Sequence, residues 1–167
     1  GDVYKRQGIG SLVVLYSIGY LSKSEQLGNF YCYLLLFMGA MLGVVLSDNF
    51  IILYLFWELT SFSSFLLISF WREKKASIYG AQKSLIITVL GGLSMLGGII
   101  LLSLATDTFS IQAMISKASD IQNSPFFILA MILFMIGAFT KSAQVPFYIW
   151  LPDAMEAPTP VLSLIHI

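Results

Sequence analysis

The sequence predicts an all-α integral membrane protein, built as a bundle of about five transmembrane helices. Of its 167 residues, 57% are hydrophobic and only 11% are charged, whereas a soluble domain carries about 25% charged residues. The apolar residues gather in stretches close to the roughly 20 residues that a helix needs to cross a bilayer. These stretches recur along the chain, which excludes a cleaved signal peptide with its single short apolar core.

Polar segments separate five apolar stretches, and none of these segments is typical of a flexible interdomain linker. Helices are expected at residues 8–21 (the tail of one helix), 30–46, 49–70, 81–105 and 126–151. Their connections are expected at residues 22–28, 47–49, 71–80 and 106–124. We therefore expect a single membrane domain.

The basic residues predict which connections face the cytoplasm. Residues 71–80 hold three basic residues against one acid, whereas residues 106–124 hold one against two. By the positive-inside rule the first connection is cytoplasmic and the second external. Alternation then places residues 22–28 and the segment after Leu151 inside, and residues 47–49 outside. Scattered apolar residues in 106–124 favour either an interfacial helix on the outer surface or an ordered loop.

Glu58 lies about eight residues from the outer end of its helix, or ~12 Å at 1.5 Å per residue. A charged group at that depth is costly and commonly marks an ion or proton pathway. Four hydroxyl side chains follow within six residues, and they could bond to the carboxylate, to water or to their own helix backbone. A neutral, hydrogen-bonded structural glutamic acid is one interpretation. A group that changes its protonation beside a nearby cation is the other, and we favour it.

Lys141 comes near the end of the last apolar stretch, shortly before Pro146. Proline removes a backbone donor and crowds the carbonyl four residues back, so we expect the helix to break after Lys141. Non-helical backbone at membrane depth is tolerated only where protein or a water-filled cavity satisfies it. Charged residues at broken helices recur in the ion sites of transporters. We therefore expect Glu58 and Lys141 to exchange partners and protons, each stabilised by the other's charge.

Three further charged residues lie near the predicted cytoplasmic side. Lys83 is one turn into its helix, where its long stem can reach water. Asp153 and Glu156 follow the last stretch in a proline-rich segment. They are either solvated loop acids or residues that attract cations at the inner mouth. On the outer side, Asp48 is interpreted as a turn-forming residue.

Tryptophan and glycine residues predict packing rather than chemistry. Trp71 and Trp150 fall at the expected cytoplasmic edges of their helices, where aromatic belts form. Two glycine pairs, at 91–92 and 97–98, lie within one helix. Such pairs favour close helix–helix contact in lipid, because the backbones can approach.

The two ends of the chain are related at the nucleotide level. Residues 2–7 can be encoded by a string whose reverse complement encodes residues 162–167. This inverted repeat is typical of a translated transposase adapter from a sequencing library. We therefore expect the natural sequence to cover residues 8–161, and residues 1–7 and 162–167 are excluded from fold reasoning. His166, the only histidine, falls in the excluded flank.

Three motifs resemble the antiporter-like membrane subunits shared by Mrp cation/proton antiporters and respiratory complex I. They are FWELTS at residues 56–61, FTKSAQVPF at 139–147 and LPDAMEAPTPV at 151–161. The resemblance covers residues 8–161. It implies the end of the third through the seventh helix of a fourteen-helix module, built from two inverted five-helix repeats with a broken helix in each. The complex I relative carries an arginine and an aspartate where this chain has residues 89–92, and their absence favours the A-type subunit of the Mrp antiporters.

The resemblance also implies roles for individual residues. Glu58 matches the family's fifth-helix glutamate, and Lys141 matches the lysine at the broken seventh helix; both take part in proton translocation. Lys83 matches a sixth-helix lysine of the central polar axis, which implies a relay role rather than contact with water. The family's eighth-helix histidine aligns with His166, within the flank excluded above.

The implied function is that of a membrane subunit of a monovalent cation/proton antiporter, a secondary transporter rather than an enzyme. It would exchange Na⁺ or another cation for H⁺ across the bacterial cell membrane, together with other Mrp subunits. Alternatives are a proton-pumping subunit of NADH:quinone oxidoreductase (complex I) or of a membrane-bound hydrogenase, and a structural scaffold. The sequence contains no metal-ligand cluster, phosphate loop or nucleophile–base pair, so no cofactor is expected. A formal net charge of zero without a basic stripe argues against nucleic acid.

Overall fold

The computed structural model describes residues 2–21 and 27–159, which form a bundle of helices. The elements are α1 (Asp2–Tyr20), α2 (Leu27–Leu46), α3 (Phe50–Ile68), α4 (Lys75–Thr106), α5 (Ile111–Ser116), α6 (Ala118–Asn123), α7 (Phe127–Lys141), the 3₁₀ helix η1 (Phe147–Trp150) and α8 (Leu151–Ala154). The all-α architecture expected from the sequence is confirmed. His166 and the rest of the C-terminal flank lie outside the described residues.

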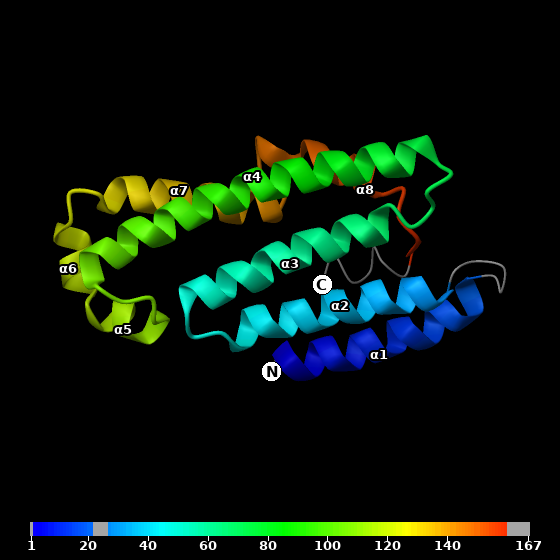
Figure 1. Cartoon of the computed structure of the whole chain (residues 1–167), viewed down its shortest axis with the longest axis horizontal. Coiled ribbons are helices and arrows are strands. Elements are labelled where there is room, and N and C mark those ends of the chain that lie inside the picture. Colours follow the sequence, from blue (N-terminus) through cyan, green and yellow to red (C-terminus); the bar gives the residue numbers. More distant parts are fainter. Residues whose placement is uncertain (1, 22–26, 160–167) are drawn as a thin grey trace.

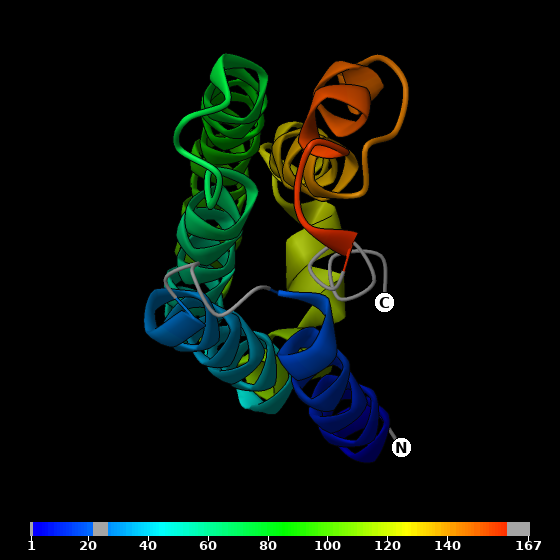
Figure 2. The ribbon, with the colours of Figure 1, turned by 90° about the vertical axis from the view of Figure 1, so that its right-hand side faces the viewer.

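The long helices lie side by side, with α3 between α4 and α2 (Figure 1). Helix α4 packs against α3 and α7 and also contacts η1 and α8, while α2 packs against α3 and α1 against α2. Viewed from the end, α4 with η1 and α8 lies at the top of the molecule, and α1 and α2 lie at the bottom (Figure 2). The helix α4 therefore contacts both α3 and α7.

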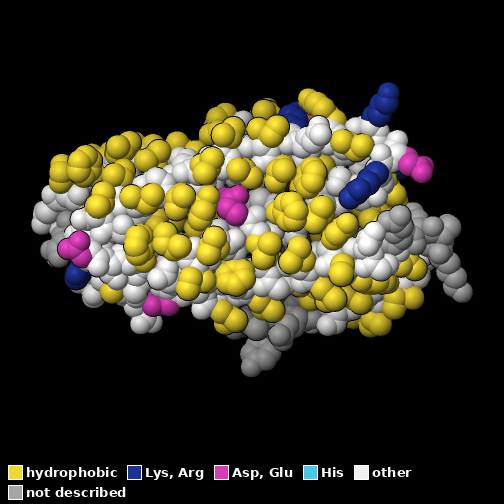
Figure 3. Space-filling model, in the orientation of Figure 1, with side chains coloured by type: hydrophobic (Ala, Val, Ile, Leu, Met, Phe, Trp, Pro, Cys, Tyr) yellow, Lys and Arg dark blue, Asp and Glu magenta, His cyan; other side chains and the backbone are white. Residues whose placement is uncertain are grey.

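Three helices of the described part are long and apolar enough to cross a membrane: α2, α3 and α4. The apolar part of α1, Gly10–Tyr20, and α7 are shorter. With 15 residues, α7 extends only ~22 Å, less than the ~30 Å hydrocarbon core, so α7 alone is too short to cross it. Hydrophobic side chains are spread over the whole face seen in Figure 3; one acidic side chain lies near its middle, and most of the other charged side chains lie toward the two ends.

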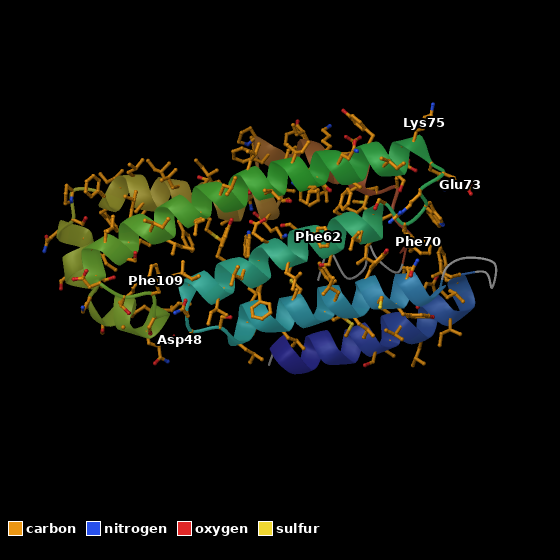
Figure 4. The ribbon with its side chains drawn as sticks, in the orientation of Figure 1. Asp48, Phe62, Phe70, Glu73, Lys75 and Phe109 are labelled. Atoms are coloured by element: carbon orange, nitrogen blue, oxygen red, sulfur yellow. The ribbon has the colours of Figure 1, made fainter. Side chains whose placement is uncertain are left out.

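The fourth helix is longer than the sequence predicts. We expected residues 71–80 to be a loop and the helix to start at residue 81. Instead α4 begins at Lys75 and has 32 residues. The basic residues of the expected loop therefore lie partly on the first turn of α4. Near this end of the bundle Figure 4 labels Glu73 and Lys75.

Asp48 and Asn49 join two connections at the opposite end of the bundle, where Figure 4 labels Asp48 and Phe109. The side chain of Asn49 accepts hydrogen bonds from the amides of Ile51 and Ile52, which satisfies unpaired donors at the start of α3. Asp48 Oδ2 accepts from Ser110 Oγ at 2.8 Å. Asp48 thus fastens the α2–α3 connection to the start of α5, beyond the turn-forming role expected.

Residues 106–124 fold as two short helices, α5 and α6, rather than as one interfacial helix or a loop without helices. Met114 of α5 is buried with Leu102 of α4 and Ala130 of α7. Lys117, between the two helices, donates through Nζ to the carbonyl of Thr106 at 2.7 Å. A lysine at this place satisfies an unpaired carbonyl and complements the negative end of the α4 dipole.

Glycines let α7 pack closely on α4. The sequence predicted this for the pairs at 91–92 and 97–98, and the structure agrees for some of these residues. A Cβ atom added at Gly98 would lie 2.7 Å from the carbonyl oxygen of Ala130, and one added at Gly137 would lie 2.9 Å from the carbonyl oxygen of Gly91. Gly97 differs, because a Cβ atom there would make only an ordinary 3.6 Å contact with Leu133. The α4–α7 interface therefore excludes side chains at some glycine positions but not at all of them.

Candidate functional site

Lys141 is the last residue of α7, at the point where the helix breaks. Ala143 adopts a left-handed conformation with φ 52°, and Pro146 precedes η1. The helix break expected from the sequence is therefore present. Lys141 Nζ turns toward α3 and donates to Ser61 Oγ at 2.7 Å. This contact joins two helices across 80 residues of sequence.

Trp150 donates a hydrogen bond to the last turn of α7 and is not an aromatic-belt residue. Its side chain is only 5% exposed, and Nε1 donates to the carbonyl of Thr140 at 2.9 Å. The last carbonyls of a helix lack partners along the helix, and at membrane depth such a group must find one within the protein. The sequence-based interpretation of Trp150 was wrong because its side chain packs inside the bundle among other buried apolar residues.

Glu58 lies in the middle of α3 and is half-buried. Its Oε1 atom is buried and has no hydrogen-bond partner among the described residues. The nearby hydroxyls do not satisfy it: Thr60 donates to the carbonyl of Trp57 at 2.6 Å, and Ser63 donates to that of Leu59 at 2.8 Å. The sequence left three possible partners for these hydroxyls: the carboxylate, water and their own helix backbone. Thr60 and Ser63 bond to the backbone.

Glu58 and Lys141 are electrostatic neighbours but do not form a direct ion pair. Each carries a Coulombic interaction with the other, while the only ion pair among the described residues lies elsewhere. The Lys141 ammonium is 5.8 Å from the centre of the Trp57 ring, beside Glu58. Ser61, one turn beyond Glu58, is the group that Lys141 contacts. The structure brings the two charges near each other and places a hydroxyl beside them.

A cavity of about 120 Å³ opens next to this contact. Several water molecules fit in such a volume, at about 30 Å³ each in the liquid. Its polar lining comes from three helices. The lining residues are Phe37, Met41, Ser61, Ser64, Ser84, Thr88, Lys141 and Trp150. Its wall is mostly apolar, but four hydroxyl groups and the Lys141 side chain belong to it and could bind water there.

Ser84 and Thr88 are cavity residues that sequence reasoning missed. Both side chains are buried and donate to carbonyls of their own helix, at 2.9 and 2.8 Å. Their spacing of four residues puts them on one face of α4, below Gly91 and Gly92. That spacing was the signal available in the sequence. It was not decisive, because two hydroxyls on a glycine-containing helix face are also compatible with simple packing.

Lys83 forms an ion pair with Asp153. The sequence analysis did not predict this pairing. Lys83 Nζ lies 2.6 Å from Asp153 Oδ2, with side chains 28% and 36% exposed. One turn earlier on α4, Gly80 lies so close to Asp153 that a Cβ atom there would overlap the carbonyl oxygen of Asp153. Lys83 therefore holds the α8 segment on α4, one residue from Ser84. Glu156 is exposed and is not part of this arrangement.

Residues 47–167 match the family described as NADH:quinone oxidoreductase/Mrp antiporter, TM. The chain is 97% identical over 156 residues to the A1 subunit of the Na⁺/H⁺ antiporter of Staphylococcus epidermidis, covering 93% of this chain and 20% of that protein. It is 87% identical over 159 residues to the protein of the same name from Staphylococcus aureus, again covering 20% of it. The chain thus spans about a fifth of the length of these relatives.

Two solved structures resemble the fold. The first, the Mrp complex from Dietzia sp. DQ12-45-1b, matches 95% of this chain and 17% of its own chain, with a TM-score of 0.87 and 38% sequence identity. The second, respiratory complex I from Thermus thermophilus with bound aureothin, matches 94% of this chain and 34% of its own chain, with a TM-score of 0.74 and 22% identity. At that identity the second likeness concerns the fold alone.

Proposed function

Because this chain belongs to the NADH:quinone oxidoreductase/Mrp antiporter transmembrane family, we propose that the full-length protein is a membrane subunit of a Na⁺/H⁺ antiporter that moves protons through Glu58 and Lys141. The chain is a multi-pass segment of a bacterial cell membrane protein. The staphylococcal relatives named as Na⁺/H⁺ antiporter subunits favour antiport over the proton-pumping alternative. The likeness to complex I supports no activity, because it concerns the fold.

The observation that carries the proposal is the contact between Lys141 Nζ and Ser61 Oγ at the wall of the cavity. The contact places a proton-carrying ammonium at a helix break, with space for water on one side and the Glu58 carboxylate near the other. In one step, Glu58 takes up a proton and its negative charge disappears. Lys141 then loses the neighbour that stabilised its ammonium form, and it releases a proton into the cavity.

The return step follows from the same electrostatics. Neutral Lys141 accepts a proton from protonated Glu58 through Ser61 or a water molecule, which restores the carboxylate and the ammonium. Lys83 precedes the cavity residue Ser84 in the chain and pairs with Asp153 of α8. We propose that the Asp153 carboxylate accepts the released proton and passes it to water while Lys83 remains an ammonium, and that Glu156 lies outside this path.

The partners of the full-length protein are part of the proposal. One matched structure is an Mrp complex, so we propose that the protein works within a hetero-oligomeric complex of Mrp subunits. We place the proposed proton path in this part of the chain and make no assignment of the cation site. Tests of transport must therefore use the assembled antiporter rather than this segment.

The test replaces Glu58 by Gln in the full-length protein, assembled with its partner subunits in everted membrane vesicles. The measurement is the collapse of a pH gradient on addition of Na⁺. We expect Glu58→Gln to reduce this exchange to the level of vesicles without the antiporter, because an amide cannot carry the proton. Glu73→Gln is the matched control, since Glu73 is exposed in the α3–α4 connection. Unchanged exchange by an intact Glu58→Gln complex would leave a structural scaffold as the better account.

A further inference from the structure

We propose that Gly92 is a positioning residue for the Glu58 carboxylate. The proposal rests on the proposed function, because it gives Gly92 a role through Glu58. Gly92 is buried on α4 and faces α3. The absence of a side chain at this position leaves a place into which the carboxylate fits.

The contact between the two residues is direct. A Cβ atom added at Gly92 would overlap Oε1 of Glu58, and it would lie 3.0 Å from Cδ and 3.6 Å from Oε2. All three atoms belong to the end of one flexible side chain. An alanine at position 92 can therefore be accommodated by moving the carboxylate, without moving α3 or α4.

Other glycines of α4 make contacts of a different kind. The added Cβ atom at Gly98 meets backbone atoms of α7, at 2.7 Å from the carbonyl oxygen of Ala130. At Gly97 it meets only a leucine methyl group at an ordinary 3.6 Å. Gly98 thus sets the distance between helices, Gly97 leaves room for a methyl group, and Gly92 alone of the three contacts the carboxylate.

The carboxylate position matters because hydrogen bonds do not hold it. Oε1 is buried with no hydrogen-bond partner among the described residues, so packing against Gly92 determines where it lies. Lys141 interacts with Glu58 through charge rather than through a direct ion pair. Both the Coulombic interaction and proton transfer through Ser61 depend on the distance between the Glu58 carboxylate and the Lys141 ammonium. Displacement of a reacting group by about 1 Å can slow a reaction ~100-fold.

The experiment measures Na⁺-dependent proton exchange by the complete antiporter in everted vesicles. It compares Gly92→Ala with the matched control Gly97→Ala, each in the wild-type and the Glu58→Asp background. We expect Gly92→Ala to lower exchange about tenfold or more, while Gly97→Ala leaves it unchanged and both variants assemble. Aspartate is one methylene shorter, so in that background the added methyl group should cost less than threefold.

The possible outcomes separate this inference from the proposed function. If Glu58→Gln abolishes exchange but Gly92→Ala behaves like Gly97→Ala, the positioning role is overturned and the proposed function stands. If Glu58→Gln exchanges normally, the proposed function itself fails. If Gly92→Ala does not assemble, assembly is measured in the Glu58→Asp background. Restored assembly there supports contact with the carboxylate, and persistent loss assigns Gly92 to helix packing and overturns the proposal.

Discussion

Lys83 Nζ lies 2.6 Å from Asp153 Oδ2, although the two residues are 70 positions apart in the sequence. The ion pair joins the first part of α4 to the short helix that follows the broken α7. Ser84, the residue after Lys83, lines the cavity. The ion pair thus connects the α8 segment to α4 one residue from a cavity residue.

Replacing either residue of this ion pair should impair Na⁺-dependent proton exchange. We expect Lys83→Gln and Asp153→Asn each to lower Na⁺-dependent proton exchange by roughly threefold to tenfold, and the double variant to be no worse than either single one. The reason is that each single change already removes the whole interaction. Exchange assays on the three variants in everted vesicles measure this, with Glu156→Gln as the exposed control. Additive losses would mean that the two residues act separately.

Removal of the Ser61 hydroxyl should weaken proton transfer without unfolding the protein. Lys141 Nζ loses its 2.7 Å acceptor in Ser61→Ala. Hydrogen bonds to charged groups contribute about 1.5–3 kcal/mol, so we expect exchange to fall roughly tenfold to a hundredfold. Ser63→Ala is the matched control, because Ser63 bonds only to carbonyls of its own helix. Equal activity of the two variants would contradict a role for the Ser61–Lys141 contact.

Trp150→Phe should destabilise the broken helix. The substitution keeps an aromatic ring but removes the N–H group that donates to the carbonyl of Thr140. A buried carbonyl left without a partner costs about 1–3 kcal/mol. We expect a lower thermal midpoint for the detergent-solubilised complex. Tyr148→Phe serves as the control, since Tyr148 is exposed. An unchanged midpoint for Trp150→Phe would show that water satisfies the carbonyl equally well.

Asp48→Ala should loosen the end of the bundle at which the α2–α3 connection meets α5, and leave transport intact. Asp48 accepts hydrogen bonds from Ser110 Oγ and from the amide of Gln112. Their loss costs about 1 kcal/mol per bond, which favours local opening of α5. Hydrogen–deuterium exchange of residues 110–116 should become faster, with Glu73→Gln as the control. A loss of Na⁺-dependent exchange would instead assign Asp48 to the ion path.

Much of the fold was predictable because membrane helices can be recognised from their composition. The stretches behind α2 and α3 are apolar over the length of a bilayer, and the structure has helices there. Pro146 predicted the break after Lys141 for a local reason, namely its missing N–H group. The start of α4 was predicted wrongly, because Lys74 and Lys75 indicated a loop although charged residues are tolerated in a first helical turn that reaches the interface.

The candidate site was predictable in its charges but not in its contacts. Glu58 and Lys141 stand out in the sequence because an ionisable group in lipid is costly wherever it lies. Their partners do not stand out: Ser61 is one of four hydroxyls, and Asp153 resembles a solvated loop acid. The adapter interpretation of residues 1–7 and 162–167 remains a proposal, which reading the DNA beyond both flanks would test.

The sequence by itself determined that this chain crosses a membrane and that Glu58, Lys83 and Lys141 are the unusual charges within it. Those conclusions depend on residue type and order, which set the cost of burial. Only the tertiary structure decided that Lys141 meets Ser61, that Lys83 meets Asp153 and that Glu58 lies against Gly92. These contacts join positions far apart in the chain, and they depend on how closely α3 and α7 approach α4.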